Sequence, residues 1–148
     1  MKILRTTTDN TDFRQLVAKL DSYLAKIDGE ETVFYSQFNK IEFLEHVILV
    51  FDEDRAVGCG ALKPVFSEKM EIKRMYTEPE FRGRGVASQV VGALELWAKE
   101  TGAKSCILET GRRQKEAVSL YRKLGYQEIP NYEPYVGVAN SICFEKVL

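Results

Sequence analysis

The chain contains 148 residues, a length that fits one compact domain spanning residues 1–148. Hydrophobic residues make up 45% and charged residues 29%, as in ordinary globular proteins, and the formal net charge is −1. This balance argues against a basic nucleic-acid-binding protein. No apolar run approaches the roughly 18 residues of a membrane helix, and the N-terminus has no apolar signal segment. We therefore expect a cytoplasmic protein that has no membrane or nucleic-acid partner.

The first elements alternate between strand and helix. Residues 3–8 predict a short strand, and Asp9-Asn10-Thr11-Asp12 supplies helix-capping side chains. Apolar residues at helical spacing then predict a helix over 13–27, which Asp28-Gly29 closes. Residues 30–43 predict a loop with a short helix.

Three strands with short connections follow and predict an antiparallel meander. After the glycine-rich segment 82–87, a helix reaches to Gly102, a buried strand covers 105–109 and a second amphipathic helix covers 114–124. Strands over 126–129 and 141–148 complete the chain. The pattern predicts an α/β (α+β) fold with a mixed, mostly antiparallel sheet of about seven strands and helices on both faces. The meander strands are 47–51, 56–66 and 69–77.

The three cysteines are far apart and show no C-x-x-C spacing, and the chain has a single histidine, His46. We therefore expect buried free thiols and no metal site. Cys106 lies in an apolar segment with no adjacent histidine, so we do not expect it to act as a nucleophile. The other two cysteines are Cys59 and Cys143.

The segment Arg82-Gly83-Arg84-Gly85-Val86-Ala87 lies between a predicted strand and a predicted helix. A helix N-terminus offers unpaired N–H groups, and glycine lets the backbone approach a ligand closely. These features predict a phosphate or pyrophosphate site. The P-loop pattern is absent, and the dinucleotide fingerprint fails because Ser88 replaces its third glycine. The R-x-x-G-x-[GA] loop of acetyl-coenzyme A enzymes fits in spacing and context.

Two motifs together resemble the GNAT superfamily of N-acetyltransferases. Residues 71–87 are similar to its fourth strand and pyrophosphate loop, and Leu120-Tyr121-Arg122-Lys123-Leu124-Gly125-Tyr126 resembles its Y-x-K-L-G-[FY] motif. The order of elements matches over nearly the whole chain. Gln114 stands where the family usually has asparagine seven positions before the motif tyrosine, which keeps the amide but alters its reach.

The resemblance implies that acetyl-CoA lies in a gap where the fourth and fifth strands splay apart. It places the pantetheine arm along Met75, Tyr76 and Thr77, paired like an added strand. The pyrophosphate would then bind the N–H groups of Arg82, Gly83, Arg84, Gly85, Val86 and Ala87, with Gln114 as a further contact. No metal is implied.

The implied reaction is direct attack of a primary amine on the thioester. Tyr121 matches the family tyrosine that protonates the leaving thiolate, although packing in the core is its alternative role. Glu71 or Glu109 would act as the base, a water chain being the alternative, and His46 lies remote from both motifs.

The acceptor amine is not readable from the sequence. The resemblance implies that residues 23–43 and the loop 130–140, with Tyr132, Glu133 and Tyr135, shape the acceptor pocket. A carboxylate between aromatic rings suits a cationic amine, although a solvated surface loop is the alternative for this segment. A small molecule or an exposed peptide end fits the short chain. The alternatives are a sensor that binds acetyl-CoA without turnover and a dinucleotide-binding oxidoreductase. We also consider a homodimer in which the C-terminal strand extends the sheet.

Overall fold

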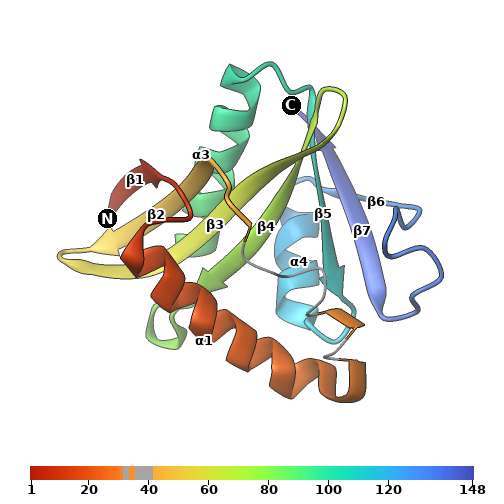
Figure 1. Cartoon of the computed structure of the whole chain (residues 1–148), viewed down its shortest axis with the longest axis horizontal. Coiled ribbons are helices and arrows are strands. Elements are labelled where there is room, and N and C mark those ends of the chain that lie inside the picture. The colour runs from red at the N-terminus through yellow and green to blue at the C-terminus, as the bar shows by residue number, and fades with distance from the viewer. Residues whose placement is uncertain (32–33, 36–41) are drawn as a thin grey trace.

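The computed structural model describes residues 1–31, 34–35 and 42–148 (Figure 1). Seven strands form one sheet in the order β1-β2-β3-β4-β5-β7-β6. Only β4 and β5 pair in parallel, and the other neighbours are antiparallel. This confirms the predicted mixed, mostly antiparallel sheet. The strands are β1 (Lys2–Thr6), β2 (His46–Asp52), β3 (Arg55–Phe66), β4 (Lys69–Thr77), β5 (Ser105–Gly111), β6 (Gln127–Ile129) and β7 (Ser141–Val147).

Helices cover both faces of the sheet, as predicted. Figure 1 shows α1 (Thr11–Asp28) in front of the sheet and α3 (Val86–Glu100) and α4 (Lys115–Lys123) behind it. Alternation along β2 explains the two layers, because Val47 and Leu49 pack against α1 whereas Ile48 and Val50 pack against α3. Two short 3₁₀ helices, η1 (Gly29–Glu31) and η2 (Pro79–Phe81), complete the elements that the structure describes.

The local signals in the sequence act largely as expected. The Asn10 side chain accepts a hydrogen bond of 3.1 Å from the Phe13 N–H and caps α1, and Gly29 follows its last residue. The predicted loop and helix over 30–43 lie partly outside the described residues. All three cysteines are buried and free, as predicted. No helix in the described parts of the chain is long and apolar enough to cross a membrane.

The C-terminal strand lies inside the sheet, which corrects one expectation. β7 pairs with β5 along its whole length and with β6 over residues 143–145, so the edge strands are β1 and β6. A dimer formed by extending the sheet at the C-terminal strand is therefore not favoured. Whether the chain forms a homodimer stays a prediction.

β4 and β5 separate halfway along their length. Their ladder ends at the pair Glu71–Ile107, although β4 continues to Thr77 and β5 to Gly111. β3 continues to pair with β4, and β7 with β5, so each strand is held from its outer side while the inner edges part. The separation leaves backbone groups of β4 without a strand partner on one side.

A β-bulge in β4 lies at this separation. Lys73 pairs with Ala61 and Tyr76 with Cys59, so two residues of β4, Arg74 and Met75, oppose the single Gly60. Arg74 has a φ of 60°, unusual for a residue with a side chain. Its guanidinium binds Asp21 of α1 at 3.0 Å, which connects the bulge to the helix in front of the sheet.

Two glycines of β3 let α3 lie close to the sheet. A Cβ added to Gly58 would lie 2.4 Å from Cγ1 of Val86, and one added to Gly60 would lie 2.5 Å from Sδ of Met75. Any larger residue would therefore push the first turn of α3 or the bulge outward. The close packing fixes the N-terminus of α3 relative to β4.

Candidate acyl-transfer cleft

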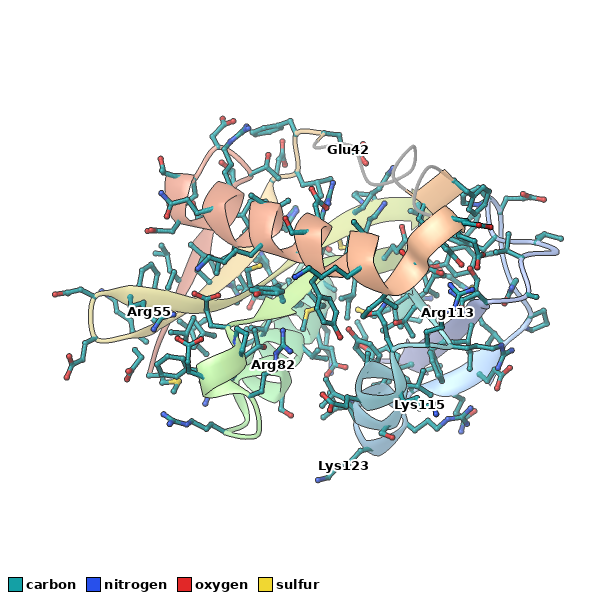
Figure 2. The ribbon with its side chains drawn as sticks, turned by 90° about the horizontal axis from the view of Figure 1, so that it is seen from below. Glu42, Arg55, Arg82, Arg113, Lys115 and Lys123 are labelled. Carbon is teal, nitrogen blue, oxygen red and sulfur yellow. The ribbon has the colours of Figure 1, made fainter. Side chains whose placement is uncertain are left out.

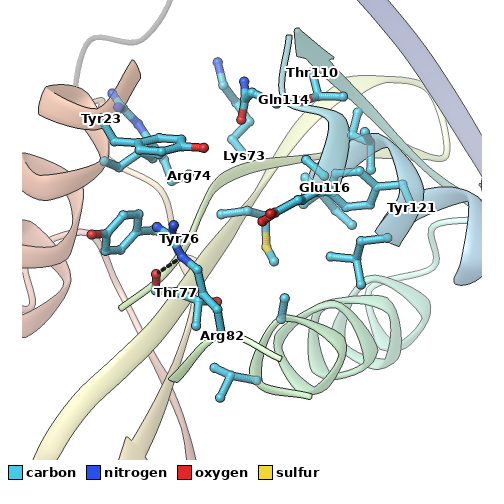
Figure 3. Close-up of a pocket in the computed structure, with 18 of the residues that line it drawn as sticks. Tyr23, Lys73, Arg74, Tyr76, Thr77, Arg82, Thr110, Gln114, Glu116 and Tyr121 are labelled. Atoms are coloured by element: carbon cyan, nitrogen blue, oxygen red, sulfur yellow. Dashed lines mark hydrogen bonds between the residues drawn. The ribbon is translucent and has the colours of Figure 1, made fainter. Parts of the chain in front are cut away.

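A cleft of about 680 Å³ opens where β4 and β5 separate (Figure 3). β4 and the glycine-rich loop of residues 82–87, the proposed phosphate loop, form one side of it. α4 and the end of β5 form the other side, and α1 contributes Leu20, Tyr23 and Leu24. Of the residues predicted for the site, all but Arg84 line this cleft. They are Glu71, Met75, Tyr76, Thr77, Arg82, Gly83, Gly85, Val86, Ala87, Glu109, Gln114 and Tyr121.

The glycine-rich loop has the conformation that an anion site requires. Gly83 and Gly85 have φ values of 77° and 79°, in the left-handed region that favours glycine. Gly85 precedes the first helical residue, Val86, so the free N–H groups of the first turn begin at the cleft. Together with the positive end of the helix dipole, these donors favour a bound phosphate.

The two arginines of the loop differ in their placement. Arg82 donates from Nε to the Thr77 carbonyl at 3.0 Å, and its guanidinium lies 5.2 Å from the Tyr23 ring centre (Figure 3). Arg84 lies over Phe81 at 5.0 Å and does not line the cleft. Any role of Arg84 in binding therefore rests on its backbone and stays a prediction.

Basic side chains lie on both sides of the cleft. In Figure 2, Arg82 lies on one side and Lys115 and Lys123 of α4 lie on the other, and all three line the cleft. The cleft thus combines amide donors with cationic side chains, an arrangement that suits a ligand with several phosphates.

The cleft and its glycine-rich loop agree with the resemblance to the GNAT superfamily, and comparison of the sequence with a family model establishes the family. The model of the Acetyltransferase (GNAT) family matches residues 12–126. The chain belongs to the GNAT acetyltransferase family. The predicted family, fold and acetyltransferase activity are thereby confirmed.

Individual relatives agree with this assignment. An "IAA acetyltransferase" of Azospirillum brasilense is 29% identical over 136 residues, covering 90% of this chain and 89% of that protein. A crystal structure from Klebsiella pneumoniae, provisionally named as an acyl-CoA N-acyltransferase, has a TM-score of 0.83 and 28% identity, covering 99% and 97%. A GNAT family acetyltransferase from Elizabethkingia anophelis, solved with acetyl-CoA bound, shares the fold with a TM-score of 0.70 at 19% identity, covering 99% and 97%.

Glu109 is the more unusual carboxylate of this GNAT acetyltransferase. Burial raises its pKa to about 7, the nearby Glu71 adds to the rise, and a hydrogen bond from Ser141 opposes it. Oγ of Ser141 donates to Oε2 of Glu109 at 2.7 Å. A group with a pKa near neutrality can accept and release protons under ordinary conditions.

A directed chain of hydrogen bonds supports Glu109 from behind. Nδ2 of Asn140 donates to the Tyr35 hydroxyl at 3.2 Å, and that hydroxyl lies 3.1 Å from Oγ of Ser141. When Glu109 is ionised it can only accept, so the Ser141 proton points to Glu109 and the Tyr35 hydroxyl is left to donate to Ser141. This series of hydrogen bonds therefore presents a donor, the Ser141 hydroxyl, to one carboxylate oxygen of Glu109.

Glu71 has a different environment. It lies at the last pair of the β4–β5 ladder, is only 6% exposed, and accepts a 2.6 Å hydrogen bond from the Tyr132 hydroxyl. Glu133, the carboxylate that the sequence offered between aromatic rings or in a solvated surface loop, is exposed. Glu71 is the carboxylate that the aromatic loop contacts.

Tyr121 lines the cleft from α4, opposite Thr77 and Arg82 (Figure 3). Its ring packs against Tyr126 and Phe144, and burial raises the pKa of its phenol, which stays protonated at neutral pH. Packing and a role as a proton donor are thus compatible. Gln114 immediately precedes α4 and lines the cleft, whereas His46 lies against Trp97 at 4.6 Å and lines no part of it.

Sequence reasoning missed two residues of the site: Lys73 lines the cleft, and Ser141 donates to Glu109. Tyr23, which lines the cleft, and Tyr35, which contacts Ser141, lie in the segment 23–43 that was expected to shape the acceptor pocket, with no individual role. The alternation of β4 places Lys73 on the same face as Glu71, a signal that was available. Ser141 and Tyr35 come from distant segments, and only the folded chain brings them together.

Proposed function

We propose that the chain transfers the acetyl group of acetyl-CoA to the primary amine of a small molecule. Membership of the GNAT family supports the reaction class, and the acetyl-CoA bound to the Elizabethkingia anophelis protein supports the donor. The observation that carries the proposal is the separation of β4 and β5 directly beside the free N-terminus of α3. One cleft thus offers a strand edge and an anion site to one extended ligand.

In this proposal the coenzyme occupies the cleft along its length. The pyrophosphate binds the backbone N–H groups of residues 82–87, and the pantetheine arm pairs with β4 at Met75, Tyr76 and Thr77. The unpaired inner edge of β4 and the positive φ of Gly83 and Gly85 support this placement. The thioester then lies between β4 and Glu109.

The reaction requires the movement of two protons. Glu109 removes a proton from the acceptor ammonium, whose ordinary pKa near 10 keeps it charged in water. Glu71 attracts the incoming ammonium. The free amine attacks the thioester carbon and forms the C–N bond, and the C–S bond breaks as the carbonyl re-forms. Tyr121 gives its proton to the leaving thiolate, and the second proton that the nitrogen loses replaces the proton of Tyr121. The raised pKa of Glu109 and the cleft position of Tyr121 support these roles.

Calorimetric titration with acetyl-CoA and a thiol-release assay with a panel of amines test the proposal. We expect micromolar binding and amine-dependent release of the thiol. Gly85→Asp should abolish binding, because a side chain and a negative charge enter the phosphate site. Gly92→Asp is the matched control, because Gly92 is an exposed glycine farther along the same helix.

The outcomes separate the proposal from its alternatives. Binding of acetyl-CoA without thiol release from any amine would favour a sensor. Unchanged binding by folded Gly85→Asp would refute the placement of the pyrophosphate. A fall in turnover of Tyr121→Phe at unchanged affinity would support its role as proton donor, and an unchanged rate would remove it from the mechanism.

A further inference from the structure

A second cavity of about 360 Å³ lies beyond the cleft, between the β3–β4 hairpin and the β6–β7 loop. Glu71, Lys73 and Tyr135 line both cavities, so the two spaces meet at Glu71, whereas Glu109 lines the cleft alone. An acceptor in the second cavity would reach the thioester from the side opposite to the phosphate loop. The other lining residues are Glu42, Lys63, Val65, Phe66, Tyr132, Glu133 and Pro134.

Aromatic rings form a continuous wall of this cavity. Phe66 and Tyr132 lie 6.2 Å apart between ring centres at 88°, and Tyr132 and Tyr135 lie 5.9 Å apart at 80°. Both contacts are edge-to-face, the geometry in which an added ring continues the series favourably. Phe66 is 53% exposed, so its ring still has a free surface beside the cavity.

The two ends of the cavity differ in polarity. At the end shared with the cleft, Glu71 accepts the Tyr132 hydrogen bond and lies close enough to Glu109 for its charge to raise the pKa of Glu109. At the other end Phe66, Val65 and Pro134 offer apolar surface. An elongated molecule with an amine at one end and an apolar group at the other matches this gradient.

Charges in the cavity argue against an acceptor with several amines. Lys63 forms a 2.8 Å ion pair with Glu42 at the rim, and Lys73 lies on β4 beside Glu71. Burial lowers the pKa of Lys73, and the nearby charge of Glu71 opposes this change. Of the other carboxylates of the lining, Glu42 is already paired with Lys63 and Glu133 is exposed to solvent, so a second ammonium group on the acceptor would gain little. A single ammonium finds the buried Glu71, with Glu109 beyond it in the cleft.

We propose that the second cavity binds a primary monoamine that carries an aromatic ring. The ring lies on the wall formed by Phe66 and Tyr132, and the amine reaches Glu71 and Glu109. This inference rests on the proposed acetyl transfer and specifies its acceptor. Aromatic contacts and apolar burial supply the affinity, and the carboxylates supply the orientation.

Steady-state kinetics with three acceptors test the inference. We expect kcat/KM for phenethylamine to exceed that for propylamine by at least about tenfold, mainly through a lower KM, because the ring buries apolar area against the wall. Spermidine should be no better than propylamine. Equal or greater kcat/KM for propylamine or spermidine would overturn the inference.

A variant of the wall gives a second test. Phe66→Ala should raise the KM for phenethylamine several-fold and leave its kcat and the KM for propylamine almost unchanged. Phe43→Ala is the matched control, because Phe43 is 60% exposed and lines neither cavity. An equal effect of Phe66→Ala on both amines would contradict the inference.

The failure of the inference and that of the proposed function give different results. If thiol release occurs with propylamine but shows no preference for the aromatic amine, acetyl transfer stands and the aromatic pocket is wrong. If no amine releases thiol although acetyl-CoA binds, the proposed function itself fails, and the inference fails with it.

Discussion

Two serine–glutamate pairs connect β5 and β7 at opposite ends of the same strand pair. Ser141 of β7 donates to Glu109 of β5 at 2.7 Å, and Ser105 of β5 donates to Glu145 of β7 at 2.7 Å. The hydrogen bonds are alike in type and length, yet the pKa of Glu109 rises to about 7 and that of Glu145 falls below its ordinary value.

The neighbours of each carboxylate explain the difference. Lys69 forms a 2.8 Å ion pair with Glu145, which favours the charged form. Glu109 is half-buried in the cleft and lies near the negative charge of Glu71, and both effects disfavour its charged form. A serine donor alone therefore does not decide the protonation of a carboxylate. One end of the strand pair is suited to proton transfer and the other to stability.

Removing the two carboxylates should give the largest contrast. Glu109→Gln should lower kcat/KM about a hundredfold or more, because the base is lost while the shape is kept. Glu145→Gln should change it less than about twofold. Thiol-release kinetics measure both, and comparable losses in the two variants would contradict the division of roles.

The stability of the protein should depend on Glu109 in a defined pH window. Its pKa is raised in the folded state, so its contribution is most favourable below the unfolded pKa near 4.3 and is lost as the pH rises toward 7. The loss is on the order of 3 kcal/mol. Urea unfolding from pH 4 to 8 should show this decline in the wild type and a flatter profile in Glu109→Gln. Equal profiles would show that burial does not raise this pKa.

Substituting the two serine donors, Ser141 and Ser105, should have smaller effects, seen in the pH dependence of kcat/KM. Ser141→Ala removes the hydrogen bond that lowers the pKa of Glu109, so the acidic limb of kcat/KM should move up by about one pH unit. Ser105→Ala should leave the limb where it is. Ser141→Thr keeps the hydroxyl and should restore the wild-type profile, whereas a uniform loss of rate without a shift would indicate a purely structural role.

The ion pair at the other end should give the smallest effect. Lys69 is 40% exposed, so Lys69→Met should reduce the free energy of unfolding at pH 7 by about 1 kcal/mol or less. The pKa of Glu145 is lowered in the folded state, so the wild-type advantage should vanish as the pH falls through that pKa. A difference in the free energy of unfolding between wild type and Lys69→Met that persists at pH 2 would assign the effect to packing of the Lys69 side chain instead.

Local sequence signals predicted most of the fold. Caps and turn residues such as Asn10, Gly29 and Gly125 sit at element ends, and the glycines of the phosphate loop sit where a positive φ is required. The bulge at Arg74 was not predictable in this way, because it depends on how β4 pairs with β3. The sequence of one strand shows the alternation of apolar and polar residues, but it does not show the register in which the strand pairs with its neighbour.

The part of the candidate site that lies in one continuous segment could be predicted from the sequence. The loop from Arg82 to Ala87 was recognised from its glycines and from its place between a strand and a helix. The support of Glu109 needed Tyr35, Asn140 and Ser141, which are far from it in sequence. Sequence alone therefore gave no reason to prefer Glu109 over Glu71 as the proposed base, because that preference rests on burial and hydrogen bonding in the folded chain.

The closeness of α3 to β3 has a consequence for evolution and screening. Gly58 and Gly60 contact Val86 and Met75 from the core side, so the amides of the phosphate loop owe their position to residues that no ligand touches. Selection for coenzyme affinity would then act on interior volume as strongly as on the loop's own side chains. A random-mutagenesis screen should recover weak binders at these two hidden glycines, while many changes at the exposed Arg84 pass unnoticed.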